Sequence, residues 1–101
     1  MGYMSDVKAV TKTADASAVV GRSRLKGIYF TNTATASSFT LRNGTTGSDT
    51  ALITITTPAV AGAQDLLLPE DGMLFDSGIY VDVNDANVTS VTLLFEGGAA
   101  A

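Results

Sequence analysis

Carboxylates are the side chains of this sequence with the clearest chemical potential, and most of them lie in its second half. Hydrolysis of a glycosidic bond needs two carboxyl groups that face each other across a cleft, one of them with a raised pKa. The candidates here lie in turn-forming stretches or at outward positions of strands, where carboxylates usually stay solvated. We therefore expect no catalytic residue, and Asp82 is the one to follow because it lies on a strongly patterned strand beside Tyr80. The carboxylates considered are Asp65, Glu70, Asp71, Asp76, Asp82 and Asp85.

A metal ion or cofactor would find few ligands in this chain. It contains no Cys and no His, which removes the thiolate nucleophile, the commonest general base and the commonest transition-metal ligand. Calcium takes carboxylate and carbonyl oxygens, so residues 70–72 and 82–85 would suit it best, although Asp and Asn are also ordinary turn residues. The phosphate-loop, dinucleotide and nucleophile-elbow motifs are missing. We expect neither a metal site nor a cofactor.

Two tyrosines offer a different kind of chemistry. Tyr29 and Tyr80 each lie in a predicted strand with Thr residues nearby, so they are candidates for a sugar-binding surface. The alternative, which we favour, is that both rings pack at strand edges with the hydroxyl in water.

Composition limits the class of partner. The 101 residues are 46% hydrophobic and carry a net charge of −4. No apolar run is long enough to span a membrane, and phosphate binding needs clustered Lys and Arg, so neither a membrane nor nucleic acid is expected as a partner. All six basic residues precede position 43, and eight of the ten acidic residues follow it. The two ends can mix on one surface, or the subunit is dipolar and meets a copy of itself or a neighbour through opposite charge.

Alternation of apolar residues indicates strands throughout. Residues 79–83 and 91–95 alternate on either side of the turn-forming segment 84–87 and predict a closing β-hairpin with one apolar face. Further strands are expected at 24–32, 39–42, 51–56, 64–68 and 73–75, with Gly27 at a bulge or between two covered faces. The pattern predicts an all-β fold: a single-domain antiparallel β-sandwich, jelly-roll-like, with seven to eight short strands.

The organisation expected from this pattern has three parts. Residues 1–21 would form an N-terminal arm or edge strand, because their small side chains bury little area. Residues 22–97 would form the β-sandwich domain, and residues 98–101 a flexible tail.

Basic and apolar side chains outside the predicted core mark an expected interface. Leu66-Leu67-Leu68 is too short a run for a helix before Pro69, and we interpret it as a strand covered on both faces or lying at a subunit contact. Leu94 stands where the outward pattern calls for a polar residue, so we expect another layer or subunit to cover it. The predicted interface comprises Lys8, Lys12, Arg22, Arg24, Leu66, Leu67 and Leu94.

Five segments between residues 25 and 96 carry a resemblance to a known group of proteins. They are Leu-Lys-Gly-Ile-Tyr at 25–29, Thr-Leu-Arg-Asn-Gly at 40–44, Ile-Thr-Ile-Thr-Thr-Pro at 53–58, Leu-Leu-Pro-Glu-Asp-Gly at 67–72 and Gly-Ile-Tyr-Val at 78–81. Their order and spacing resemble those of small β-rich virion structural proteins of tailed bacteriophages, especially marine and cyanobacterial phages. This group includes capsid decoration or cement proteins and head-fibre or tail-associated proteins.

The resemblance implies a non-enzymatic particle component, located in the virion after assembly in the host cytoplasm. Its partners would be other virion proteins, such as the major capsid protein or tail components, and copies of itself, often as trimers. The first hypothesis is a capsid decoration or cement protein that oligomerises and binds the capsid surface. The alternative is a tail or fibre module that binds a host surface glycan through loops and exposed aromatics such as Tyr29 and Tyr80.

Overall fold

A computed structural model describes residues 7–68 and 71–101, and in this part of the chain every regular element is a β-strand. Eight strands are formed, and no helix of the described residues could span a membrane. The strands are β1 (Lys8–Lys12), β2 (Ala16–Asn32), β3 (Ser37–Asn43), β4 (Thr50–Thr57), β5 (Gly62–Leu67), β6 (Met73–Phe75), β7 (Gly78–Val83) and β8 (Val88–Ala100).

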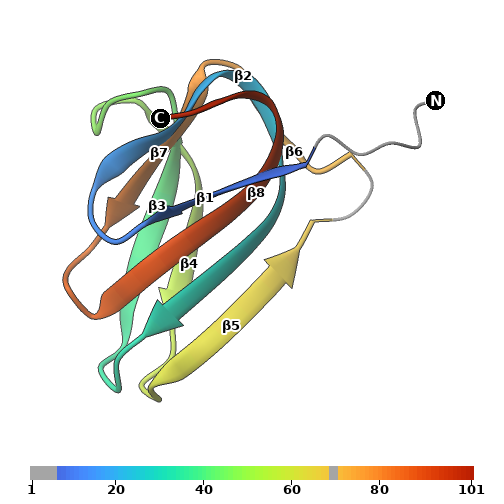
Figure 1. The fold of residues 1–101 in the computed structure, drawn as a ribbon. Helices are drawn as coiled ribbons and strands as arrows, with labels where there is room; N and C mark the ends of the chain where they lie inside the picture. Colours follow the sequence, from blue (N-terminus) through green and yellow to red (C-terminus); the bar gives the residue numbers. More distant parts are fainter. Residues whose placement is uncertain (1–6, 69–70) are drawn as a thin grey trace.

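All strand pairs are antiparallel and belong to one open sheet with the order β1-β8-β2-β7-β3-β4 (Figure 1). β2 organises this sheet because its two halves have different neighbours. On one side it pairs with β8 from Val19 to Asn32, and on the other side its first half pairs with β7 and its second half with β6 and β5. Gly21 lies between the halves with a φ of +92°, a left-handed conformation that glycine adopts at little cost.

The core lies between two parts of the sheet that face each other. Phe30 of β2 and Phe39 of β3 are in edge-to-face contact with ring centroids 5.2 Å apart, although β2 and β3 are not neighbours in the sheet. Such offset aromatic pairs add to the stabilisation that comes from burial alone. The buried apolar residues come from five strands: Ala18, Val19, Leu25, Ile28, Phe30, Phe39, Leu41, Phe75, Ile79, Val81, Val88, Val91, Leu93 and Phe95.

The prediction of a single-domain, all-β antiparallel fold with seven to eight strands is confirmed. The finer prediction of a jelly-roll sandwich stays a prediction, since the eight strands belong to one open sheet. Of the two alternatives predicted at Gly27, a bulge or a strand covered on both faces, the structure has the bulge, because the register between β2 and β8 shifts between Leu25 and Gly27.

The predicted closing hairpin is wrong. β7 pairs with β2 and β3, whereas β8 pairs with β1 and β2. The connection at residues 84–87 is tied to other loops: the Asn84 N–H donates to the Ser38 carbonyl at 3.0 Å, and the Thr33 N–H donates to the Asn87 carbonyl at 2.9 Å. The connection therefore carries the chain from one part of the sheet to the part that faces it, and both strands still turn their apolar side toward the shared core.

The N-terminal segment is more closely integrated than the predicted arm. Lys8 to Lys12 pair with β8 as an edge strand, which agrees with the edge-strand alternative; residues 1–6 lie outside the described residues. β2 already begins at Ala16, so the predicted boundary between residues 21 and 22 falls inside a strand.

The C-terminal segment is a strand end rather than the predicted flexible tail. Ala99 and Ala100 of β8 lie opposite Val20 and Val19, and the backbone N–H of residue 101 donates to the carbonyl of residue 18 at 2.9 Å. The close approach depends on small residues, since a Cβ at Gly98 would lie 2.8 Å from a methyl group of Val19.

Candidate interaction surface

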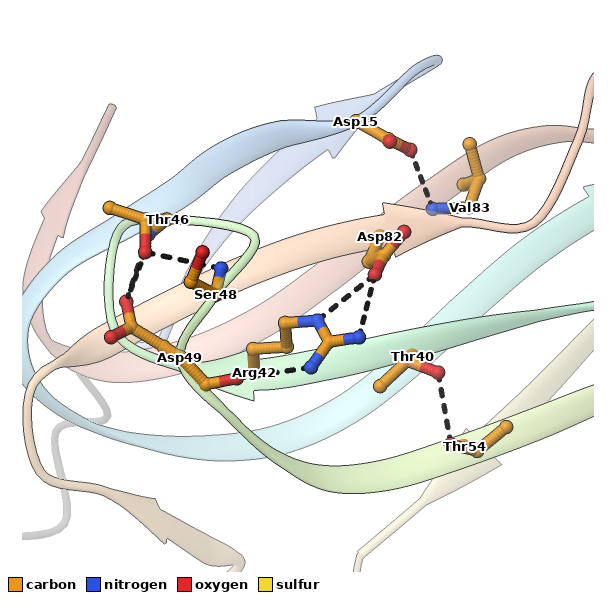
Figure 2. Close-up of polar contacts among 9 residues, drawn as sticks. All are labelled: Asp15, Thr40, Arg42, Thr46, Ser48, Asp49, Thr54, Asp82 and Val83. Atoms are coloured by element: carbon orange, nitrogen blue, oxygen red, sulfur yellow. Dashed lines mark hydrogen bonds and ion pairs between the residues drawn. The ribbon is translucent and has the colours of Figure 1, made fainter.

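The outward side of β3 and β7 is a polar surface whose groups satisfy one another. The Arg42 guanidinium contacts Asp82 through two nitrogens, each 2.9 Å from the same carboxylate oxygen, and also donates to the Asp49 carbonyl at 3.0 Å (Figure 2). Beside this pair, the hydroxyls of Thr40 and Thr54 lie 2.9 Å apart. Asp82, the carboxylate singled out from the sequence, is therefore the partner of a structural ion pair.

Two further carboxylates cap turns. The Thr46 N–H and hydroxyl donate to Asp49 at 2.9 and 3.0 Å, and these bonds lower the pKa of Asp49. The Asn87 N–H and the Ser37 hydroxyl donate to Asp85 at 2.9 and 2.8 Å and lower the pKa of Asp85 in the same way. A catalytic acid needs a raised pKa. The lowered pKa of Asp49 and of Asp85 instead favours the ionised carboxylate, which does not suit a general acid.

The other acidic candidates are dispersed. Asp65, Asp71 and Asp76 are exposed, and Glu70 lies outside the described residues. Among residues 7–68 and 71–101, no group of three or more acidic side chains is placed to hold a metal ion. Of the two segments considered for calcium, 82–85 has Asp82 engaged with Arg42 and Asp85 engaged in its turn.

The two tyrosines lie in different parts of the sheet. Tyr29 is 46% exposed and lies in register with Thr92 and Asp65. Tyr80 lies in register with Arg42 on the polar surface, and its ring lies against Gly47 of the loop that follows β3. The structure does not bring them together into one sugar-binding surface.

The outward side of β1, β8, β2 and β5 has a different character. The registers place Ala9, Leu94, Gly27 and Leu67 in one row across these four strands. A Cβ at Gly27 would lie 3.2 Å from a Leu67 methyl group and 3.3 Å from a Leu94 methyl group, so the two leucines flank the glycine. Leu67 is 72% exposed.

The next row on this side is mixed polar and aromatic. Thr11, Thr92, Tyr29 and Asp65 lie in register across the same four strands. The Thr11 and Thr92 hydroxyls lie 2.7 Å apart. We name these two rows together the leucine face: Ala9, Leu94, Gly27, Leu67, Thr11, Thr92, Tyr29 and Asp65.

The predicted interface residues divide between the two sides of the sheet. Leu67 and Leu94 are brought together on the leucine face. Leu66 is opposite the buried Ile28 in the register, so it lies on the other side of β5. Alternation within a strand imposes this separation of neighbouring leucines.

The two predicted lysines also lie away from the leucine face. Lys8 is opposite Phe95 and Lys12 opposite Val91, on the core side of β1. The Lys8 ammonium donates to the Gly98 carbonyl at 2.9 Å and lies 5.6 Å from the Phe95 ring centroid. Lys12 donates to the carbonyl of the last residue at 3.0 Å. Both lysines hold the end of β8 and are not presented together with the leucines.

Arg22 and Arg24 border the leucine face. They line an open pocket together with Ser23, Glu96 and Gly97. Arg24 is in register with Glu96, one row beyond Leu94, and Glu96 is paired with Lys26 at 3.5 Å. Within the described residues neither arginine forms an ion pair.

Asn32 and Gly27 position the leucine face, and the sequence alone did not assign this role to either residue. Asn32 is buried, and its amide donates to the carbonyls of Pro58 and Val60, which hold the connection into β5. Gly27 provides the space between Leu67 and Leu94. The break in alternation at Gly27 was a usable signal, but nothing in the sequence marks Asn32 apart from other strand-end asparagines.

Comparisons with protein-family models, curated proteins and solved structures find no match to this chain. The leucine face and its arginine border therefore have to be interpreted from their own chemistry.

Proposed function

We propose that the chain is a non-enzymatic structural protein of a phage virion, specifically a capsid decoration or cement protein that oligomerises and binds the capsid surface. The observation that carries the proposal is the leucine face, where Leu67 is 72% exposed next to Leu94. An apolar patch rimmed by polar residues is typical of a protein interaction site. The resemblance of the five sequence segments supplies the kind of particle.

The contrast between the two outward sides supports a binding role for one of them. Arg42 and Asp82 satisfy each other on the polar surface. On the other side, Leu67 and Tyr29 keep large apolar areas in water. Covering such area stabilises a complex by about 25 cal/mol per Å² before the costs of association.

The test is reattachment to capsids assembled without this protein. The wild-type chain, a Leu67→Ser variant and a Leu52→Ser control are each added, the capsids are pelleted, and the bound fraction is measured. Leu52 is also exposed, at 40%, but lies on β4 at the other end of the sheet. We expect the wild type and the control to bind equally and Leu67→Ser to bind at least about tenfold more weakly. Failure of the wild type to bind would refute the proposal.

A tail or fibre module that binds a host glycan is the second candidate, favoured by the half-exposed ring of Tyr29 beside the Thr92 hydroxyl. Sugars stack on such rings, and hydroxyl and carboxylate neighbours orient them. Glycan-array binding that is lost in Tyr29→Ala and kept in Tyr80→Phe would support it. An array without signal for the wild type would exclude it.

A further inference from the structure

Three rows of the outward side differ in charge along the strand direction. The central row, Ala9, Leu94, Gly27 and Leu67, is apolar. The row on one flank holds Arg24 and Glu96, with the Lys26 ammonium next to Glu96. Among the described residues, Arg24, Lys26 and Glu96 give this flank a net charge of +1, and Arg22 in the adjoining pocket makes it more basic. The row on the opposite flank carries Tyr29 and Asp65, with a charge of −1.

From this order we infer that the leucine face packs against the same face of a second copy of the chain, about a two-fold axis that runs along the central row. A half-turn about this axis reverses the strand direction and stacks Leu67 and Leu94 on their own copies. It also places the basic flank of each copy on the Tyr29 and Asp65 flank of the other. The arrangement is isologous, so each favourable contact is made twice. The inference rests on the self-association included in the proposed function and specifies its surface and symmetry.

Charge selects this axis over the other in-plane choice. A two-fold axis parallel to the strands would keep the rows aligned, so that the basic flank of one copy faces the basic flank of the other and the Asp65 flank faces the Asp65 flank. Like charges that face each other across an interface are unfavourable. An axis along the central row instead pairs unlike charges and brings the Arg24 guanidinium onto the Tyr29 ring, a cation–π geometry.

Both charged partners are available for such contacts. Within the described residues, Arg24 forms no ion pair, and Asp65 is exposed on an edge strand. Leu67 and Leu94 already lean toward Gly27 from either side, so the central row offers a low, continuous apolar ridge. Aligned sheets pack face to face through such ridges.

Charge reversal tests the inference by sedimentation velocity over a concentration series. Arg24→Glu and Asp65→Lys are measured singly and together, with Lys12→Glu as a control that changes the charge equally on the core side of β1. We expect each single reversal to weaken the dimer at least about tenfold. The double variant should return to within about threefold of wild type, and the control should match wild type.

Leu67→Ser is a second, uncharged variant and is expected to remain monomeric. Circular dichroism checks that each variant keeps its β signal. Single reversals without effect, or a double variant as weak as the singles, would overturn the inference. A wild-type chain that binds capsids but stays monomeric would overturn the inference and the self-association in the proposed function, while its capsid binding would stand. A dimer that responds to the charge reversals as expected but does not bind capsids would support the inference and refute the proposed capsid binding.

Discussion

Asn32 fixes the position of β5, and its removal tests how the leucine face is held in place. Its side chain is 5% exposed, and its amide nitrogen lies 2.8 Å from the Thr33 carbonyl, 3.1 Å from the Pro58 carbonyl and 2.9 Å from the Val60 carbonyl. Pro58 and Val60 lie in the connection from β4 to β5. One buried amide therefore ties this connection to the end of β2, where pairing with β5 begins.

The cost of Asn32→Ala follows from these contacts. An amide group has two hydrogens for three acceptors, so about two full bonds are lost, and each unmet buried group costs about 1–3 kcal/mol. Within residues 7–68 and 71–101 the buried Asn32 amide oxygen accepts no hydrogen bond, and deleting it removes that penalty. We therefore expect a loss of about 2–3 kcal/mol in the free energy of unfolding, which corresponds to roughly 10–20 °C in Tm for a domain of this size.

Urea unfolding followed by circular dichroism measures the loss, and hydrogen exchange locates it. The β5 amides should exchange faster in Asn32→Ala than in wild type, because the connection that anchors β5 is released. Asn84→Ala is the matched control, since Asn84 is exposed and its backbone N–H, not its side chain, is bonded within the described part of the chain; it should stay within about 0.5 kcal/mol of wild type. An Asn32→Ala protein as stable as the control would refute the reasoning.

Two further predictions concern a glycine and a carboxylate. Gly78→Ala should cost at least about 3 kcal/mol in urea unfolding, because φ is +126° and the new Cβ would lie 2.6 Å from the Val19 carbonyl oxygen; Gly47→Ala, whose Cβ would find only ordinary contacts with Tyr80, should cost less than about 1 kcal/mol. The pKa of Asp85 is lower in the folded than in the unfolded chain, so its contribution to stability is complete above about pH 4 and is lost as pH falls through the folded pKa. Asp85→Asn should accordingly be less stable at pH 7 and should show a flatter dependence of stability on pH below about 4, and an unchanged slope would contradict this assignment.

Alternation in the sequence predicts which side of each strand is buried. Phe39 and Leu41 of β3, and Val91, Leu93 and Phe95 of β8, are all buried as predicted. The reason is local: a strand that covers a core must place apolar side chains at every second position. The same reasoning offered a bulge as one of two alternatives at Gly27, where the alternation breaks, and the structure has the bulge.

Alternation of apolar residues does not predict which strands pair with each other. β7 and β8 both alternate correctly and are joined by only four residues at 84–87, yet they pair with other strands and not with each other. Alternation reports a strand's relation to the core and not to its neighbour, and a short turn-forming connection serves a crossing between facing strands as well as a hairpin. The C-terminal alanines were predicted to form a tail for a related reason. Their pairing with β2 depends on backbone contacts. Small side chains permit these contacts, but no pattern in the sequence indicates them.

The candidate surface was predicted in part, for the same physical reasons. Leu94 was recognised because it is apolar at an outward position, and this needs only the parity of its strand. That Leu67, and not Leu66, shares its side of the sheet depends on the β2–β5 register. The lysines were assigned to the interface by charge alone, and their bonds to the carbonyls of the β8 end depend on contacts between the two ends of the chain.

Substitution of Leu67 by Ser can show whether this side chain contributes to the stability of the monomer or to association. At 72% exposure it buries only about a quarter of its side chain in the single chain, so a change to Ser should alter the stability of the monomer by no more than about 0.5 kcal/mol. In a face-to-face dimer the same side chain would be buried against its copy, where full burial of a leucine is worth roughly 1.5–3 kcal/mol. Because Leu67 is exposed beside another leucine, on a sheet whose other outward side is polar, we expect it to contribute mainly to a contact outside the chain. A Leu67→Ser protein that lost monomer stability and association in equal measure would show instead that the leucine belongs to the fold.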